Sequence, residues 1–528
     1  MSKYNYKSIL NCLKGVAKME VKMDLLSNRA LFTDLYELTM LQGYFEKNKI
    51  DHLATFEYHF RNNPFNGGYT VFAGIQDVLN YLKNLSFSTS DIDYLQSIGK
   101  FSDAFLKYLE NFHFTGIIEF VPEGTIVFPY EPIVQIIAPL GQAQLIESAL
   151  LNFLNYQTLI ATKASRIVTS AKYNKVIEFG LRRAHGDAAI VGSRASVIGG
   201  CIGTSNVVAG KIYGIPVSGT HAHSWIMSFA KPEVDTKTTE LEAFREYVSI
   251  YPNDSILLVD TYDTLASGVP NAITVGKELK EKGFTLKGIR IDSGDLVWLS
   301  IESAKQLDAD GFTETFIVLS NDLDEYIIES IQAQIKQYID NASENDKLFY
   351  KRMSKRILYG VGTSLITGSG GKQSALGGVY KLTEIDERPV MKYSENIEKR
   401  TNPHQKNLWR IEQNKQFIAD VVTLKEESQP QIGAIIYHNF DVLKKFKIPQ
   451  GCNVYSMYQK IDFSSNGDLI KISDLVKVDG WKQAQEQCQN DLTKLNYTHK
   501  RLVNPHTYKV SLSEELFNLK NTLYNKLL

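Results

Sequence analysis

One pattern occurs four times in this chain, as SILLVDTYDT (255–264), LKGIRIDSGD (286–295), TFIVLSND (315–322) and ILYGVGTS (357–364). Each copy is a short apolar run that ends in polar or glycine residues. The copies begin roughly 30 to 40 residues apart, and a strand, its crossover helix and the next parallel strand need about 30 residues. The pattern therefore predicts a parallel sheet, either open or closed into an α/β barrel.

Working outward from these copies, similar apolar runs at 175–179 and 215–218 predict two further strands. The pattern is lost after Leu376, where GGVYKL and PVMKYS resemble a β-hairpin that we expect to join the N-terminal part. We predict four parts, which are an extension (1–28), an N-terminal α+β domain (29–150), an α/β barrel (151–375) and a C-terminal segment (376–528) that partly completes the flanking domain.

The composition excludes several classes of protein. Of the 528 residues 43% are hydrophobic and 22% charged, which is typical of a globular chain and not of a disordered one. The net charge of -1 argues against a global basic field for nucleic acid. The four cysteines show no zinc spacing and favour a reduced, cytoplasmic compartment. The longest run without charge, between Lys211 and Lys231, is too polar for a membrane helix.

Polar residues gather directly after every predicted strand. The loops are FGLRRAHGD (179–187), GTHAHSW (219–225), DTYDT (260–264), IDSGD (291–295), SND (320–322) and GVGTS (360–364). In barrels and parallel sheets the carboxyl ends of the strands form the active site. Polar loops and helix-capping aspartates offer a simpler explanation for any one loop, but six loops in series favour a site.

The residue types in these loops suit an anionic, phosphorylated substrate. Arg182, Arg183 and Arg290 can bind phosphate or carboxylate through two parallel hydrogen bonds. Glycines such as Gly362, Gly370 and Gly371 let backbone N–H groups approach phosphate oxygens, and Thr363 adds a hydroxyl. Asp260, Asp263, Asp292 and Asp295 can hold Mg²⁺ through water or bind ribose hydroxyls, with helix capping as the alternative.

His223 is the most distinctive single residue. It follows a predicted strand and a Gly-Thr turn, where a histidine can act as a base, a metal ligand or a nucleophile. His221 is a competing candidate two positions earlier, and spacing alone does not separate the two.

Taken in order, these motifs resemble the nicotinate phosphoribosyltransferases. The resemblance covers about Leu31 to Leu382 and rests on the motifs FTDLYELTM (32–40), EFGLRRAHG (178–186), GTSNVVAGKIYGIPVSGTHAHS (203–224), GIRIDSGDL (288–296), VLSNDLDE (318–325) and GVGTSLITG (360–368). It implies a type II phosphoribosyltransferase fold, an irregular α/β barrel with a flanking α+β domain built from both chain ends. It also implies a homodimer with shared active sites.

The implied reaction joins nicotinate to 5-phosphoribosyl 1-diphosphate and gives nicotinate mononucleotide and diphosphate. ATP hydrolysis is coupled to it, which places such enzymes in the ligase class, and Mg²⁺ is required through ligands that the resemblance leaves unknown. The resemblance implies roles for named residues: Tyr36, Thr220 and Arg290 at nicotinate; Thr363 with Gly362, Gly370 and Gly371 at the phosphoribosyl phosphate; Arg182, Arg183 and Asp292 in the pocket; and His223 as the histidine that ATP phosphorylates.

Two other functions remain as alternatives. Nicotinamide phosphoribosyltransferase has similar motifs, but it carries an aspartate where this chain has Ser205. A carboxylate there would repel nicotinate, so Ser205 favours the acid as substrate. The second alternative is a non-catalytic barrel that serves as a scaffold, and the full set of arginines, aspartates and glycine loops argues against it. The role of residues 440–528 is not predicted.

Overall fold

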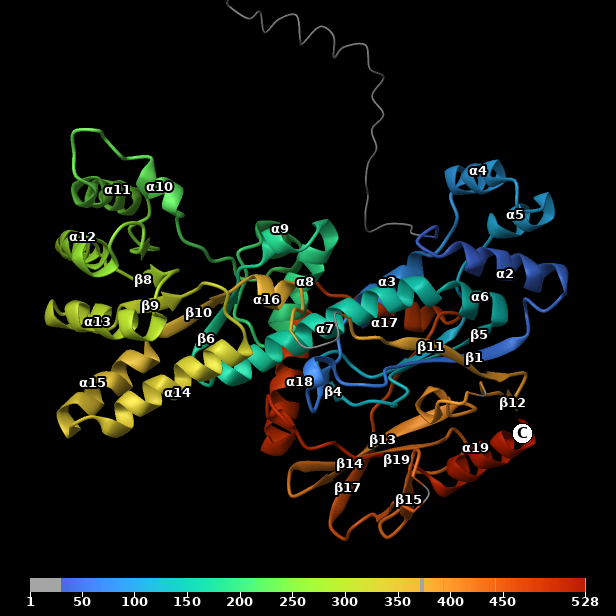
Figure 1. Ribbon diagram of the computed structural model, residues 1–528. Coiled ribbons are helices and arrows are strands. Elements are labelled where there is room, and N and C mark those ends of the chain that lie inside the picture. Colours follow the sequence, from blue (N-terminus) through green and yellow to red (C-terminus); the bar gives the residue numbers. More distant parts are fainter. Residues whose placement is uncertain (1–29, 371–374, 393, 442, 528) are drawn as a thin grey trace, which may run out of the picture. The chain divides into compact units, whose positions relative to one another are not determined.

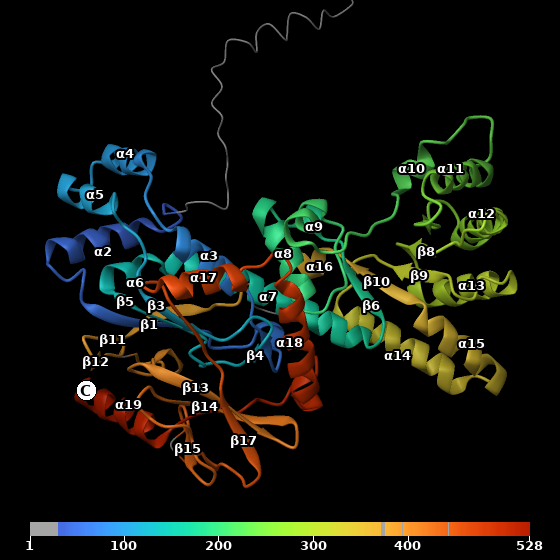
Figure 2. The same cartoon turned by 180° about the vertical axis from the view of Figure 1, so that it is seen from behind.

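The computed structural model describes residues 30–370, 375–392, 394–441 and 443–527 (Figures 1 and 2). The predicted extension 1–28 lies outside the described residues. Contacts divide the described residues into two compact units, one that contains residues 30–32 and 81–114 and another that contains residues 33–80 and those from 115 onwards.

The α-helices of the described residues are α2 (Leu35–Glu46), α3 (Ile75–Asn84), α4 (Thr89–Ile98), α5 (Asp103–Leu109), α6 (Leu140–Leu145), α7 (Glu147–Ala171), α8 (Gly186–Ile198), α9 (Val207–Tyr213), α10 (His223–Met227), α11 (Thr236–Ile250), α12 (Val269–Glu281), α13 (Leu296–Ala309), α14 (Glu325–Asn341), α15 (Glu344–Lys355), α16 (Thr363–Ile366), α17 (Asn466–Leu475), α18 (Trp481–Lys494) and α19 (Glu514–Leu527). In the smaller unit, α4 begins with a capping box in which Ser88 and Asp91 each accept the other's backbone N–H.

The central sheet of the larger unit is parallel, in the order β6 (Lys175–Glu178), β10 (Ile357–Val361), β9 (Phe316–Leu319), β8 (Gly288–Ile291) and β7 (Ile256–Leu258). Five of the six predicted strands are therefore confirmed. The prediction of a strand at 215–218 is wrong. Only Val217 pairs there, in an isolated bridge with Thr204, because Pro216 has no N–H to continue a ladder.

The sheet closes into an irregular barrel, as predicted, but without a full set of strands. Thr204 forms a bridge to Glu178 on β6 on one side and to Val217 on the other. The ring of His221 then accepts the backbone N–H of Leu258 on β7, with 3.2 Å between Nε2 and N. Two bridges and one side-chain hydrogen bond thus complete the circle that the five strands leave open.

The flanking domain combines both ends of the chain, as predicted. Its sheet is β12 (Arg388–Pro389), β11 (Val379–Ile385), β1 (Leu53–His59), β5 (Val134–Pro139), β3 (Ile117–Phe120) and β18 (Gln459–Asp462), and the described pairs are antiparallel. A small ladder joins β2 (Thr70–Val71) to β4 (Ile126–Val127). The predicted hairpin after Leu376 is confirmed as β11 and β12.

A further sheet in the C-terminal part was not predicted. Its order is β16 (Lys445–Lys447), β15 (Ile435–His438), β19 (Val510–Leu512), β14 (Gln416–Leu424), β13 (Lys406–Gln413) and β17 (Cys452–Ser456). Arg410 on β13 lies directly opposite Asp420 on β14, and both side chains are fully buried. The guanidinium donates to both carboxylate oxygens, at 3.0 Å from Nε and 2.6 Å from Nη2, and also to the carbonyl of Ile126.

Replacing Arg410 with methionine should destabilise this sheet by about 3–5 kcal/mol, because it leaves the Asp420 carboxylate buried without its counter-charge. Native-state hydrogen exchange of the β13 and β14 amides measures the loss. Arg245→Met is the matched control. It removes an exposed pair with Glu278, which contributes at most about 1 kcal/mol. Equal effects of the two substitutions would contradict the prediction.

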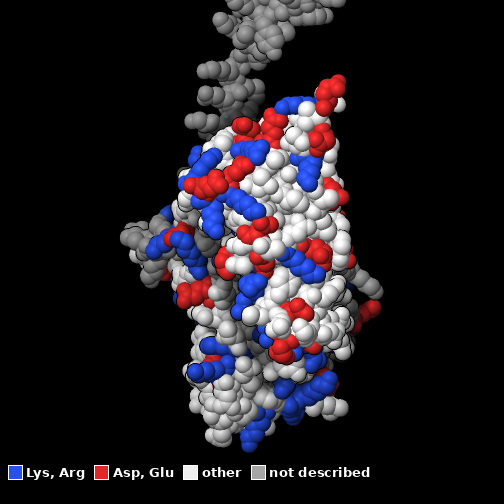
Figure 3. All heavy atoms as spheres, turned by 90° about the vertical axis from the view of Figure 1, so that its left-hand side faces the viewer, with Lys and Arg blue, Asp and Glu red and all other residues white. Residues whose placement is uncertain are grey.

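The face of the molecule in Figure 3 carries lysine, arginine and carboxylate side chains of both signs close together. No helix among the described residues is long and apolar enough to cross a membrane.

Candidate functional site

The carboxyl ends of the parallel strands hold most of the predicted residues. Arg290 lies near the end of β8, and its guanidinium is oriented from three sides. Nε donates to Ser320 Oγ at 2.9 Å, Nη1 donates to Thr220 Oγ1 at 3.1 Å, and Nη2 lies 2.9 Å from Asp292 Oδ1. The guanidinium carbon lies 5.8 Å from the ring centre of Phe179. The structure thus joins three loops that are distant in sequence.

These contacts leave Arg290 with binding capacity. An arginine has five N–H donors, and three are used by Ser320, Thr220 and Asp292. The side chain is 17% exposed, so the remaining donors are accessible from a partly dehydrated site. A fixed fork of N–H groups in such a site is suited to a carboxylate.

A cavity of about 500 Å³ adjoins Phe179 and Thr220. Its walls include apolar strand residues such as Ile177, Val318 and Leu358. Its volume lies within the range of about 300–1,000 Å³ of small-molecule sites. Its lining also includes Asp254, Lys287 and Phe316 at the amino ends of the strands but not Arg290, so the cavity meets the cluster around Arg290 at Phe179 and Thr220.

Two of the four loop aspartates cap helices, and two belong to the site. The carboxylates of Asp263 and Asp295 accept the N–H groups of the residues that follow them, so capping explains both. Asp260 instead accepts from the backbone N–H of Asp292 at 2.9 Å and from Ser293 Oγ at 2.6 Å through Oδ2. Its Oδ1 is buried and has no hydrogen-bond partner among the described residues.

The pair Asp260 and Asp292 fits Mg²⁺. Within the described part of the chain, no group of three or more potential ligand side chains is gathered. Mg²⁺ commonly uses only one or two carboxylates, together with water and substrate phosphates. The unpartnered Oδ1 of Asp260 is the atom with a lone pair to offer such an ion.

The two histidines of the motif have different environments. His223 begins α10, is partly exposed, and its Nδ1 lies 3.1 Å from Thr261 Oγ1, so Nε2 stays available. His221 is only 7% exposed, and its Nε2 already accepts the N–H of Leu258. The geometry therefore favours His223 over His221 as a group that reacts with a ligand.

The pH dependence of stability should reveal the buried His221. Burial lowers the pKa of His221 to about 4, whereas an unfolded histidine has a pKa near 6.5. Between these values only the unfolded chain takes up the proton, so stability falls as the pH drops from about 6.5 towards 4, by up to about 3 kcal/mol. Urea unfolding of His221→Asn should show a flatter profile across this window. The exposed His113→Asn should keep the wild-type slope, and an unchanged slope in His221→Asn would refute the assignment.

The remaining predicted residues lie around this cluster or apart from it. Arg182 and Arg183 are exposed on the 3₁₀ turn η3 (Leu181–Arg183) after β6. Ser205 is half-buried, and its N–H donates to the carbonyl of Glu178 at 2.9 Å. Gly362 precedes the short helix α16, which begins at Thr363.

Glu178 was missed by sequence reasoning. It is fully buried, and its carboxylate accepts from the hydroxyls of Ser193 and Thr204 and from the N–H of Gly180. Burial raises the pKa of Glu178. Phe179, Ser320 and Thr261 were likewise not singled out, although each lies in a loop that the pattern identified.

Three predicted residues are not joined to the cluster. Gly370 has φ of 120°, and a Cβ there would lie 3.1 Å from the buried Nζ of Lys163. Gly371 lies outside the described residues. Tyr36 is 47% exposed on α2, where partial burial, then Glu147 and Glu37, raise its pKa to about 12. The structure does not bring Tyr36 to Arg290 within this chain.

Comparison with known proteins gives one consistent result. The sequence matches the nicotinate phosphoribosyltransferase N-terminal domain over residues 31–155, the nicotinate phosphoribosyltransferase family over 174–423, and the corresponding C-terminal domain over 405–520. A protein of Bacillus subtilis (strain 168) named nicotinate phosphoribosyltransferase is 40% identical over 504 residues, which are 93% of this chain and 94% of the relative. A Caenorhabditis elegans protein of the same name is 35% identical over 94% of this chain and 93% of its own length.

Solved structures agree. The chain is similar to human nicotinic acid phosphoribosyltransferase with a TM-score of 0.76 and 27% identity, over 93% of this chain and 99% of that one. It shares a fold with a nicotinate-nucleotide pyrophosphorylase from Pyrococcus furiosus, with a TM-score of 0.63 and 19% identity over 88% and 95% of the two chains.

Proposed function

This chain belongs to the nicotinate phosphoribosyltransferase family, and on that premise we propose that it joins nicotinate to 5-phosphoribosyl 1-diphosphate. The products are nicotinate mononucleotide and diphosphate, and the reaction contributes to NAD salvage. One observation carries the assignment to an acid substrate. The Arg290 guanidinium, held by Thr220, Ser320 and Asp292 and facing the ring of Phe179, keeps unused N–H donors at the carboxyl edge of the parallel sheet.

The chemistry follows from this geometry. Nicotinate lies at the carboxyl edge of the sheet with its carboxylate on Arg290 and its ring near Phe179, so that its nitrogen can attack C1 of the ribose. Breaking the bond to diphosphate develops positive charge on the ribose and negative charge on the leaving group. The exposed Arg182 and Arg183 are placed to offset the negative charge. Mg²⁺, held through Asp260 and Asp292, would supply further charge stabilisation to the phosphates when bound.

The phosphate of the sugar is assigned to the glycine loop. Gly362 and Thr363 follow β10 at the same edge of the sheet as Arg290, and Gly370 adopts a backbone conformation that favours glycine. Backbone N–H groups and the Thr363 hydroxyl are the donors expected to bind phosphate oxygens.

ATP coupling is assigned to His223. Its Nε2 attacks the γ-phosphorus of ATP, the bond to the β-phosphate oxygen breaks, and ADP leaves. The phosphohistidine is later hydrolysed by water, which returns His223 and phosphate. The hydrogen bond between Nδ1 and Thr261 supports this role, because it fixes the ring and leaves Nε2 free. The coupling places the enzyme in the ligase class.

The exposed position of Tyr36 is the reason to propose a homodimer with shared active sites. The Tyr36 ring is assigned to nicotinate but lies apart from Arg290 of the same chain. In a dimer it can contact the nicotinate bound by the second copy. We also assign the protein to the cytoplasm. Its substrates are found there, and the reducing environment keeps cysteines as free thiols.

The testing experiment measures mononucleotide formed from nicotinate and from nicotinamide, each with 5-phosphoribosyl 1-diphosphate and Mg²⁺, with and without ATP. We expect product from nicotinate alone, and more with ATP. Ser205→Asp should weaken nicotinate binding, because the new carboxylate repels the substrate's own. Turnover of nicotinamide by the wild type would move the assignment to the amide, and a folded protein without turnover would indicate a scaffold.

A further inference from the structure

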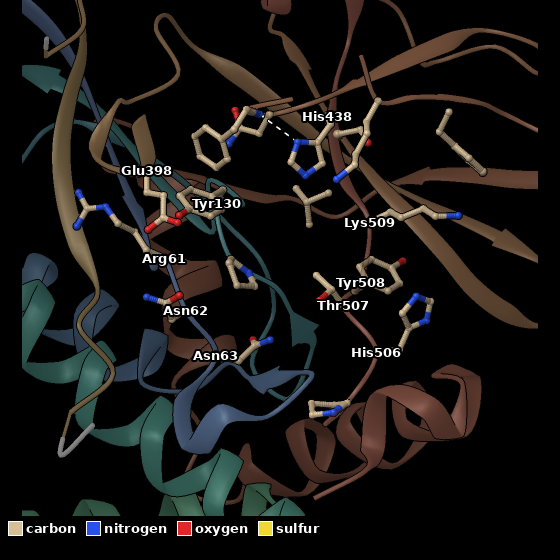
Figure 4. A pocket seen from close by; sticks show the side chains of 18 of the residues that line it. Arg61, Asn62, Asn63, Tyr130, Glu398, His438, His506, Thr507, Tyr508 and Lys509 are labelled. Carbon is tan, nitrogen blue, oxygen red and sulfur yellow. Dashed lines mark hydrogen bonds between the residues drawn. The ribbon is translucent and has the colours of Figure 1, made fainter. Parts of the chain in front are cut away.

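A second, larger cavity lies in the part of the chain to which no role has been given. Its volume is about 1460 Å³, and its walls are the loop after β1 (61–67), the turn at Pro129 and Tyr130, the segment 438–446 and the segment 504–511 (Figure 4). None of its lining residues belongs to the six loops at the carboxyl ends of the barrel strands.

The walls carry an excess of positive charge. Four lining residues are cations, namely Arg61, Lys444, Lys445 and Lys509, whereas Glu398 is the lining carboxylate. Among the described residues, Lys444 pairs with Asp441, but no carboxylate lies within 4 Å of the other three cations. The chain as a whole has a net charge of -1. The lining is therefore more positive than the chain average, which suits an anionic ligand.

Two of the unpaired cations, Lys445 and Lys509, contact aromatic rings. Lys445 Nζ lies 4.9 Å from the ring centre of Tyr437, and Lys509 Nζ lies 4.4 Å from that of Phe446. Nε of Arg61 is buried without a hydrogen-bond partner. Cation–π contacts reduce the freedom of the lysine side chains while leaving their N–H donors unused. The ordering cost of binding an anion is correspondingly lower.

A neutral donor complements these charges. His438 Nδ1 accepts the backbone N–H groups of Phe440 at 3.2 Å and Asp441 at 3.0 Å, so this nitrogen carries no proton. The proton of the neutral ring is on Nε2, which faces the cavity in Figure 4. Burial, followed by the charge of Lys444, lowers the pKa of His438 and favours this form. Thr507 and Asn63 lie around the same space.

One wall of the cavity is aromatic. The rings of Tyr130 and Phe440 meet edge to face with 4.7 Å between their centres. Tyr130 lies in a turn with a φ of 69°, which sets the direction of its ring. A planar base can stack on such a wall.

We propose that this cavity is a second ligand site, which binds a nucleotide with two or more phosphates. The unpaired cations and the fixed His438 donor suit a chain of phosphates, and the Tyr130–Phe440 wall suits the base. The volume exceeds the range of about 300–1,000 Å³ typical of small-ligand sites, which favours an extended ligand over inorganic phosphate. Both nucleoside polyphosphates and dinucleotides have this chemistry.

The test labels the full-length wild-type protein with 8-azido-ATP and maps the cross-linked peptides. We expect labelled peptides that contain residues 438–446 or 504–511, with competition by ADP or NAD but not by AMP. Stronger competition by ADP would identify the ligand as a nucleoside polyphosphate, and stronger competition by NAD would identify it as a dinucleotide. Labelling confined to the barrel loops, or equal competition by AMP, would overturn the proposal. Cross-links to the barrel loops in addition to this site would indicate ATP bound near His223, which tests the proposed ATP step independently.

A second experiment reverses the charge of the lysines that line the cavity and measures nucleotide binding. Lys445→Glu with Lys509→Glu should weaken nucleotide binding at this site at least tenfold, whereas Lys460→Glu, an exposed control on β18, should leave it unchanged. Because a double reversal can disturb the sheet, the neutral pair Lys445→Gln and Lys509→Gln is measured as well, with circular dichroism to verify folding. It should give an intermediate loss. Unchanged labelling in both folded double variants would refute the assignment.

Discussion

Arg290→Ala is expected to lower kcat/KM for nicotinate by about 30- to 4,000-fold. Removing one member of a buried, hydrogen-bonded charge pair costs about 2–5 kcal/mol, and each 1.4 kcal/mol is tenfold in rate. Two effects act in the same direction. The substrate carboxylate loses its donors, and the Asp292 carboxylate loses its counter-charge and then repels the substrate.

Steady-state kinetics with varied nicotinate measure this loss. Arg290→Lys keeps the charge but not the planar fork that holds Thr220 and Ser320, so KM for nicotinate should rise while the fold is retained. Arg245→Ala, on the exposed surface of α11, is the control and should stay within twofold of the wild type. A wild-type KM in both Arg290 variants would exclude this residue from the nicotinate site.

His223→Ala is expected to reduce nicotinate-dependent ATP hydrolysis at least 100-fold, because no other group in the motif has a free, accessible ring nitrogen. Synthesis of mononucleotide without ATP should persist, since the attack on C1 does not involve His223. The measurement uses γ-labelled ATP and scores acid-labile phosphate on the protein together with release of ADP.

Two further variants separate the roles of the neighbouring groups. The His221→Asn variant should still be phosphorylated at neutral pH. In the wild type, Nε2 of His221 accepts the backbone N–H of Leu258, so this ring is not the group that we expect to react. Thr261→Val should lower the rate of phosphorylation without abolishing it, since it removes the contact that orients His223. Full phosphorylation of His223→Ala, or its loss in His221→Asn alone, would reverse the assignment of the two histidines.

The spacing of the apolar runs predicted the parallel sheet well, because each run is buried on both faces and needs no distant partner to be recognised. The apolar run at 215–218 was wrongly predicted to be a strand. Its hydrophobicity is typical of a strand, but Pro216 has no N–H to donate to a neighbouring strand. The C-terminal sheet escaped prediction because its order mixes strands from 406 to 512, and such pairing depends on contacts far apart in sequence.

The candidate site was predictable in its location and less so in its details. Loop composition identified Arg290 and Asp292, and the family resemblance added Thr220; the structure does bring these three together. It could not separate Asp260 from the capping Asp263, because both follow the same strand and only the direction of each carboxylate distinguishes them. The buried Glu178 was hidden for a similar reason, since its three donors come from separate segments.

The irregular closure of the barrel has a consequence for its motion. Backbone hydrogen bonds join β6 to residues 202–205 and these to residues 216–218, but the step to β7 is made by a side chain, the ring of His221, whereas β8 and β9 are joined by a continuous ladder. A junction that rests on a side-chain hydrogen bond opens at a lower free energy than a continuous ladder. Thr220 and His223 flank the His221 junction, so we expect local opening of the barrel to move these two residues before it moves Arg290 on β8.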